Sequence, residues 1–338
     1  MTFGPRETDL LLSDWIAAEA IFHLKNTSYW TKPDWVSNTK IHKIIYNVVE
    51  KNELPVTTSW YMHGAFVHDY NSLGLNFEKF VSHCIGLKRG PIRYRSRVRE
   101  ILENFDDVYV DIIYFSDIIN SYSSNDYLDY LYHYEVPDKY APSYLAKHAI
   151  FGDRGNLTSL MNYLTIGLLE DLEDTEDPLD IINGIYNDIS DFNSTVYKLY
   201  QDKLIERNAR IFFDSLEECL NKLEYLLKRG SVLSTGSGSI INIFKNNFIW
   251  GVWRPYACYI TRDTVTGPWE ETVKKRRVVS WRSDALSDYL KNKSQMDLFL
   301  STLNLHMNYE DYKFILRDDG PLSASILKLL KTYTRRSD

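Results

Sequence analysis

One stretch, residues 37–67, constrains the fold of this chain more than any other. From Thr39 to Glu50 the apolar residues recur at i, i+3, i+4, i+7 and i+8, the spacing of one buried face of an amphipathic helix. Ser37 or Asn38 is in place to cap this helix. The pattern predicts a helix that faces the core, with its polar residues pointing elsewhere. The apolar residues are Ile41, Ile44, Ile45, Val48 and Val49, and the polar ones are His42, Lys43 and Asn47.

A short strand and a turn are predicted directly after this helix. Glu53-Leu54-Pro55 ends the helix, and residues 56–61 are rich in β-branched and aromatic side chains. Gly64 indicates a turn, and residues 65–67 continue as a second strand. An earlier helix is predicted from Asp9 to Leu24, with Thr8 as its N-cap. The order helix, helix, strand, turn, strand resembles a winged helix in outline.

The helix that contains Lys40-Ile41-His42-Lys43-Ile44-Ile45-Tyr46, followed by the corner Ser59-Trp60-Tyr61-Met62-His63-Gly64, resembles the Panacea domain, the SocA-like antitoxin family. The resemblance covers about residues 8–85 and extends at most to residue 150. Where the family has a tyrosine before the glycine and a proline after it, this chain has His63 and Ala65.

The resemblance implies a small, mostly helical protein-interaction domain of toxin–antitoxin or phage-defence systems, and it implies no catalytic chemistry. The partner is then another protein: a toxin, a defence effector or a phage protein. The predicted contact residues are Trp60, Tyr61, His63 and Gly64.

The periodicities along the chain predict a mostly α-helical protein with one small β-hairpin. Three regions are expected: a helical domain with the hairpin over 1–150, a helical hairpin with an acidic loop over 156–229, and a mostly helical C-terminal region over 240–338. Glycines at 152 and 155 and the Gly/Ser-rich run 230–239 separate them. In the last region, separate helices are expected over 284–291 and 294–307.

Two basic clusters make the chain a candidate for nucleic-acid binding. The first leads from a Gly-Pro loop into a helix predicted over 95–105, and the second lies beside Trp281. A solvated cationic surface that pairs with the acids downstream is the alternative. The candidate residues are Lys88, Arg89, Arg93, Arg95, Arg97, Arg99, Lys274, Lys275, Arg276 and Arg277.

Residues 104–138 alternate acidic, tyrosine and apolar residues. The spacing of Val110, Ile113, Tyr114 and Ile118 predicts a buried helical face with acids opposite. Residues 104–138 are then expected to form two acidic helices that carry tyrosines, and their charge repels nucleic-acid phosphates. These helices could mimic the phosphates or dock a basic protein. The alternative is that they are two ordinary solvated helices.

The totals of the chain narrow the class of protein. Its net charge is −7, so any nucleic-acid site must be local, and 25 tyrosines suit half-buried or partner-facing surfaces. Three widely spaced cysteines and the lack of a signal-peptide pattern predict a cytoplasmic protein with reduced thiols. No segment has the pattern of a membrane span.

No catalytic signature accompanies these features. The sequence predicts no catalytic residue, no metal site and no cofactor, and it favours a non-enzymatic protein. The first hypothesis is a protein-interaction or regulatory component, antitoxin-like or a phage-defence accessory or sensor. The second is a nucleic-acid-binding regulator. The third is a nuclease with an unrecognised site, for which only the frame Asp311-Tyr312-Lys313 was found.

Overall fold

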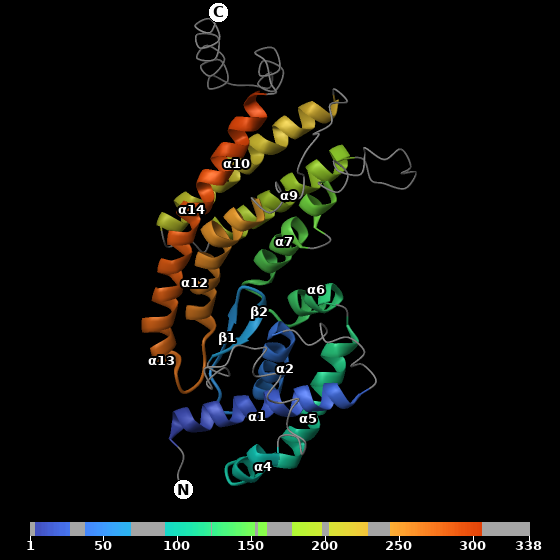
Figure 1. Cartoon of the computed structure of the whole chain (residues 1–338), viewed down its shortest axis with the longest axis vertical. Helices are drawn as coiled ribbons and strands as arrows, with labels where there is room; N and C mark the ends of the chain where they lie inside the picture. Colours follow the sequence, from blue (N-terminus) through green and yellow to red (C-terminus); the bar gives the residue numbers. More distant parts are fainter. Residues whose placement is uncertain are drawn as a thin grey trace, which may run out of the picture. The chain divides into compact units, whose positions relative to one another are not determined.

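The structure is a computed structural model of the chain. The described residues are 4–27, 38–68, 92–122, 124–152, 155–160, 178–197, 203–228 and 244–305. They are mostly helical, with one two-stranded antiparallel hairpin, as the sequence predicts (Figure 1).

The chain divides into two compact units, each built from two separated segments. The first comprises Met1–Ala141 and Tyr256–Ser283, and the second comprises Pro142–Pro255 and Asp284–Asp338. The sequence assigns residues 240–338 to one C-terminal region, whereas the structure places part of that region in the first unit.

Three helices form the core of the first unit: α1 (Pro5–Asn26), α2 (Asn38–Lys51) and α5 (Phe105–Ser121). Each packs against the other two. Helix α1 begins earlier than the sequence suggests, because Gly4 is its N-cap and donates its N–H to the Glu7 carboxylate at 3.2 Å. Most of α1 is buried, on all of its sides.

The apolar face predicted for α2 is confirmed, since its five aliphatic residues are between 0 and 3% exposed. The prediction that His42 and Lys43 point away from the core is wrong, because both are buried. The hairpin covers this second side of α2. There Lys43 Nζ donates to the carbonyl of Ala65 at 2.9 Å, and His42 Nδ1 accepts the N–H of Val67.

The hairpin consists of β1 (Thr58–Tyr61) and β2 (Gly64–Val67), paired in register from Thr58↔Val67 to Tyr61↔Gly64. Gly64 has a φ of +102°, a region that residues with a side chain rarely adopt. A Cβ atom at this position would lie 2.5 Å from Lys43 Nζ and 2.6 Å from Leu131. Both the turn and the close packing therefore require glycine.

The basic and acidic stretches form α4 (Ile92–Arg99), α5 and α6 (Ser124–Tyr134). Helix α4 ends at Arg99, earlier than the predicted residue 105. On α5 the predicted inward face is wrong: Val110 and Tyr114 are 63% and 53% exposed, while Val108 and Ile112 are fully buried.

The later segment of the first unit contains the C-terminal part of α12 (Arg254–Thr264), then α13 (Glu270–Thr272) and the π-helical turn η3 (Val273–Arg277). It ends at the start of α14 (Val278–Leu305). One continuous helix thus replaces the two predicted over 284–291 and 294–307.

The second unit is helical, as predicted, with α7 (Ala141–Phe151), α9 (Pro178–Tyr197), α10 (Lys203–Lys228) and the π-helical turn η2 (Ile249–Trp253). Its core is aromatic: the rings of Phe151 and Phe248 stack with centroids 4.1 Å apart, and Phe192 and Phe212 pack beside them. Most of the predicted acidic loop, the Gly/Ser-rich run and residues 311–313 lie outside the described residues.

Candidate anion-binding site

The later segment of the first unit adds to the hairpin across more than 200 residues of sequence. Thr58 and Thr266 exchange two backbone hydrogen bonds of 3.0 and 3.2 Å. The N–H of Trp60 donates to Thr264 Oγ1, and Thr261 Oγ1 donates to the carbonyl of Trp60. The same strand therefore fixes both the end of α12 and the loop that follows it.

Apolar packing holds the same segment in place. Cys258, Val265, Val273 and Val278 form a buried cluster, and Tyr61 of the hairpin packs against it. The ring of Tyr61 stacks on Trp281 with centroids 4.5 Å apart. As a result, η3 and its four consecutive cations have a defined position on the first unit.

A pocket of about 810 Å³ lies between this segment and the N-terminal end of α1. Its lining carries four cations and one carboxylate, a formal excess of three positive charges on a chain whose net charge is −7. We call it the Arg/Trp pocket. Its lining residues are Arg6, Trp269, Glu271, Thr272, Val273, Lys275, Arg276, Arg277, Ser280 and Trp281.

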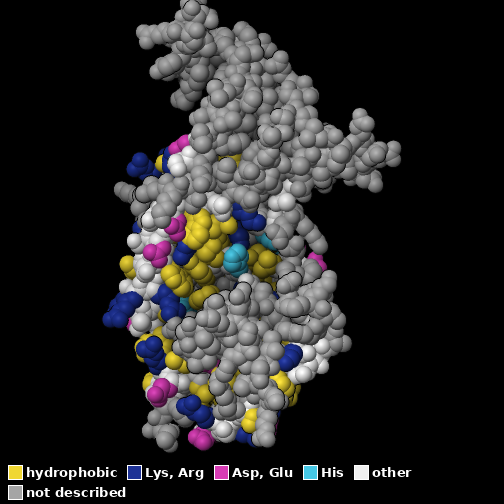
Figure 2. Space-filling view, in the orientation of Figure 1, with side chains coloured by type: hydrophobic (Ala, Val, Ile, Leu, Met, Phe, Trp, Pro, Cys, Tyr) yellow, Lys and Arg dark blue, Asp and Glu magenta, His cyan; other side chains and the backbone are white. Residues whose placement is uncertain are grey.

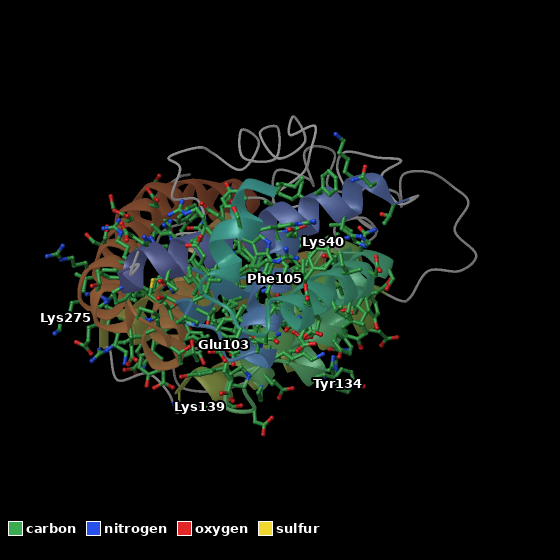
Figure 3. The ribbon with its side chains drawn as sticks, turned by 90° about the horizontal axis from the view of Figure 1, so that it is seen from below. Lys40, Glu103, Phe105, Tyr134, Lys139 and Lys275 are labelled. Carbon is green, nitrogen blue, oxygen red and sulfur yellow. The ribbon has the colours of Figure 1, made fainter. Side chains whose placement is uncertain are left out.

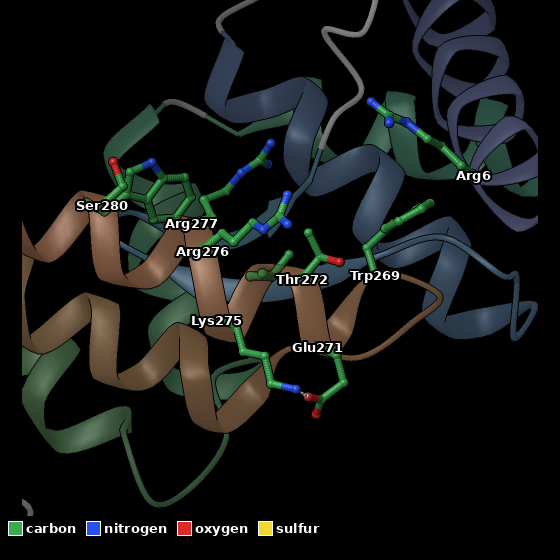
Figure 4. A pocket seen from close by; sticks show the side chains of 10 residues that line it. Arg6, Trp269, Glu271, Thr272, Lys275, Arg276, Arg277 and Ser280 are labelled. Carbon is green, nitrogen blue, oxygen red and sulfur yellow. Dashed lines mark ion pairs between the residues drawn. The ribbon is translucent and has the colours of Figure 1, made fainter.

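The cations of the Arg/Trp pocket differ in how tightly they are held. Figure 4 shows Arg276 and Arg277 extending from one helical turn toward the side on which Arg6 and Trp269 lie. Arg6 is exposed and lies 5.6 Å from the ring centroid of Trp269. Arg276 is exposed, and within the described part of the chain it has no acidic partner. Lys275 is neutralised by Glu271 at 2.8 Å.

Arg277 is the most firmly positioned cation. It is half-buried and lies 5.8 Å from the ring centroid of Trp281. Its Nη1 lies 3.3 Å from His68 Nδ1. Because a guanidinium only donates hydrogen bonds, His68 Nδ1 is the acceptor.

This contact also fixes the tautomer of His68, which forms a buried pair with a serine. Ser59 Oγ lies 2.9 Å from His68 Nε2, and both residues are 1% exposed. With Nδ1 accepting, the neutral ring carries its hydrogen on Nε2 and donates it to Ser59. A histidine in this tautomer does not take a proton from the serine. The pair therefore supports Arg277 and the hairpin, and it does not generate a nucleophile.

The arrangement suits an anion with an aromatic part. Guanidinium groups match the geometry of phosphate and form charge-assisted hydrogen bonds with it. Trp269 and Trp281 are half-buried, so part of each side chain is accessible at the pocket. In Figure 2, Lys and Arg side chains border an apolar patch that lies over the hairpin.

The first basic cluster does not form a comparable site. Lys88, Arg89 and the side chain of Arg93 lie outside the described residues. Arg95 is committed to the fold, since its guanidinium forms two bonds of 2.6 and 2.8 Å to the buried carboxylate of Glu19. Arg97 is exposed. Arg99 lies 3.7 Å from Asp106, which agrees with the alternative that this surface pairs with acids downstream.

The hairpin corner differs from the exposed aromatic surface that the sequence suggested. Trp60 is 2% exposed, and its Nε1 donates to the hydroxyl of Tyr46 at 3.1 Å. Tyr61 is half-buried against Trp281, and only His63 is exposed. Trp60 is therefore a core residue, and it does not present its ring to a partner.

Sequence reasoning identified the four cations of η3 but missed Arg6, Trp269 and the link to the hairpin. Arg6 precedes the predicted first helix, and nothing in its local sequence connects it with residues 269–281. The run Lys274–Arg277 next to Trp281 was the one local signal.

The described residues contain neither a candidate metal site nor a candidate membrane span. Among them, no group of three or more His, Cys, Asp or Glu side chains is placed to hold a metal ion. None of the described helices combines the length and apolar character needed to cross a membrane.

Comparison with known proteins gives one match. No curated protein and no solved structure matches the chain. The model of a domain of unknown function, DUF8098, matches residues 92–335, and this range includes every lining residue of the Arg/Trp pocket except Arg6. Because the match covers more than two thirds of the sequence, the chain belongs to the DUF8098 family.

Proposed function

We propose that the chain binds single-stranded nucleic acid, with phosphate groups held by the arginines of the Arg/Trp pocket and a base stacked on one of its tryptophans. The observation that carries this proposal is the local excess of three positive charges beside two accessible tryptophans. Proteins that bind single strands combine a cationic groove with aromatic side chains, because every base has a face on which an aromatic ring can stack.

The proposal narrows the nucleic-acid hypothesis to the second basic cluster. Arg95 is held by Glu19, so reversing its charge would damage the fold and would not report on binding. Arg6 and Arg276 are both exposed and both line the pocket. They are the side chains whose removal tests binding with least effect on the core.

We expect the double variant Arg6→Gln/Arg276→Gln to bind a fluorescent oligothymidine at least about tenfold more weakly than the wild type. The slope of log affinity against log salt should become shallower by about 1.4, because each phosphate contact on a single strand contributes about 0.7. Fluorescence anisotropy between about 50 and 200 mM salt measures both quantities.

Arg262→Gln is the matched control, since Arg262 is an exposed arginine of α12 that does not line the pocket. It should retain the wild-type affinity and slope. A wild-type protein that leaves the anisotropy of the probe unchanged at about 50 mM salt would show that the proposal is wrong. Equal losses in the control and the double variant would also contradict it.

The hypothesis of an antitoxin-like interaction component stays a prediction. Its specific form, in which Trp60 contacts a partner, is disfavoured by the burial of that ring. A protein partner would need a different surface, and the first unit offers one on α5 and α6.

A further inference from the structure

We propose that the solvent-facing side of α5 and α6 is a docking surface for a basic segment of a partner protein, one that combines lysine or arginine with apolar side chains. We call this surface the tyrosine face. It is separate from the Arg/Trp pocket: Figure 3 shows Tyr134 and Lys275 on opposite sides of the first unit.

The tyrosine face holds most of the large hydrophobic side chains that are exposed in the described part of the chain. Five large hydrophobic side chains are exposed in the described residues, and three of them, Val110, Tyr114 and Tyr134, are 63, 53 and 77% exposed on this face. Val110 and Tyr114 are four residues apart on α5 and so share one side of that helix. Apolar side chains scattered singly over a surface are ordinary, but neighbouring ones indicate a binding surface.

Tyrosines of α6 and of the turn before it form a cluster of rings. The ring of Tyr130 lies 5.2 Å from that of Tyr134 and 5.7 Å from that of Tyr122. Burial, the charge of Glu135 and the neighbouring phenols raise the pKa of Tyr130, and those phenols include Tyr114 of α5. Tyr114 of α5 is thus near enough to Tyr130 of α6 to influence its protonation. Tyrosine is enriched at protein interfaces because it offers a large apolar ring with a polar tip.

The charge around these rings selects a basic partner. From Glu100 to Asp138 the chain has ten carboxylates and neither a lysine nor an arginine. Three of these carboxylates are paired within the fold: Asp111 with Lys51, Asp117 with His23, and Asp106 with Arg99. At the start of α5, Glu103 and Asp107 form no ion pair within the described residues.

A second pocket, of about 490 Å³, lies at this end of α5, and Asp107 in its lining is three residues before Val110, on the same side of the helix. Its lining includes the carboxylates of Glu103, Asp106 and Asp107 against the single cation of Arg99, a formal excess of two negative charges. The N-terminus of α5 contributes only about half a positive charge. The balance stays negative, so the pocket can accept the end of a lysine or arginine side chain beside the apolar contacts of Val110 and Tyr114.

The same charges argue against other occupants. Nucleic acid and acidic membrane surfaces are repelled by the local excess of carboxylates at the start of α5. Electrostatic complementarity raises the association rate and fixes the orientation of a partner, while the exposed rings supply the buried area. The charge and the exposed apolar side chains together therefore favour a basic, partly apolar protein segment.

The test uses a defined probe, a synthetic 20-residue helical peptide with leucine on one side and lysine on the other. Its counterpart with glutamate in place of lysine is the charge control. We expect the lysine peptide to bind the full-length protein in isothermal titration calorimetry and the glutamate peptide not to bind. The variant Tyr114→Ser/Tyr134→Ser should weaken binding at least tenfold.

This double variant is decisive because it leaves the charge of the protein unchanged. Any acidic protein attracts a lysine-rich peptide. Weaker binding by an Asp107→Lys variant would therefore not distinguish binding at the tyrosine face from general electrostatic attraction. Val279→Ser is the matched control, because Val279 is 60% exposed on α14 and lies outside this surface. It should bind like the wild type.

Three results would overturn the proposal. The first is equal binding by the wild type and the tyrosine variant, and the second is equal loss in the Val279→Ser control. The third is a wild-type dimer that becomes monomeric in the tyrosine variant, which would assign this surface to a second copy of the chain. The single-strand binding proposed above does not depend on any of them, because Tyr114 and Tyr134 do not line the Arg/Trp pocket.

Discussion

Lys147 shows how burial changes the chemistry of one side chain in the second unit. Its Nζ lies 5.0 Å from the ring centroid of Trp253. Burial, together with the nearby charge of Lys245, lowers the pKa of Lys147 to about 7. In the unfolded chain the same amine has its ordinary pKa near 10.5. Between these two values the unfolded state binds more protons than the folded state.

The stability of the second unit should therefore rise with pH between about 7 and 10. Replacing Lys147 with Met removes the buried amine, so the variant should be more stable than the wild type at pH 7 and should lose this rise. Urea unfolding at several pH values measures the effect. Lys293→Met is the control, because Lys293 forms an ordinary pair with Asp297 on α14. If the unfolding free energy of the wild type changed with pH as little as that of Lys147→Met, the lowered pKa of Lys147 would be contradicted.

The sequence-based prediction also failed for single charged residues that are held inside the fold. Lys43 and Arg95 look like surface residues in the sequence, yet Lys43 is 1% exposed and Arg95 serves the buried Glu19. Their partners lie 22 and 76 residues away. Local composition contains no information on such distant contacts, so it assigned both cations to solvent.

At the scale of elements, periodicity predicted helices well where one side was clearly apolar. It succeeded on α2, whose aliphatic stripe is narrow. It failed on α5, where Val108 and Ile112 compete with Val110 and Tyr114 for the inward position. Both sets have helical spacing, and only the packing against α1 and α2 decides between them. The exposed set then becomes the tyrosine face.

The hairpin depends on one glycine. Gly64→Ala introduces a Cβ at positive φ and in contact with Lys43 and Leu131, so the variant should lose about 1–3 kcal/mol of unfolding free energy. Chemical denaturation followed by circular dichroism measures the loss. Gly4→Ala is the control, since a Cβ there meets nothing within 4 Å, and it should stay within about 1 kcal/mol of the wild type. A Gly64→Ala variant with the unfolding free energy of the wild type would show that the hairpin does not require glycine at this position.

For the whole molecule, the main difference from the sequence-based prediction is the composition of the first unit. The fold class was predictable because it follows from local periodicity. The joining of residues 256–283 to the hairpin was not, because it rests on hydrogen bonds and rings more than 200 residues apart. The Arg/Trp pocket exists only through this joining, so the sequence showed its cations but not the site.

A fragment of residues 1–150 should therefore be much less stable than the first unit in the full chain. It lacks six hydrogen bonds made by Thr57, Thr58 and Trp60, each worth about 1 kcal/mol, and it exposes the apolar cluster around Val273. This loss is comparable to the whole stability of a typical domain. Urea unfolding should show no cooperative transition for the fragment. A separately produced fragment of residues 244–305 should restore one.

Cooperative unfolding of the 1–150 fragment at the midpoint of the full chain would contradict this expectation. It would mean that the hairpin and α1, α2 and α5 hold together without the later segment.

The bond between Thr58 and Thr266 also has a consequence for the way the protein is made. The two residues are 208 positions apart, so the ribosome needs about 10–40 s to reach Thr266 after it has added Thr58. Through that interval the outer edge of β1 has no strand beside it, and such edges invite pairing with other chains. Slow translation of the second unit would lengthen the exposure, and chaperone binding to nascent chains should be strongest before residue 266 emerges.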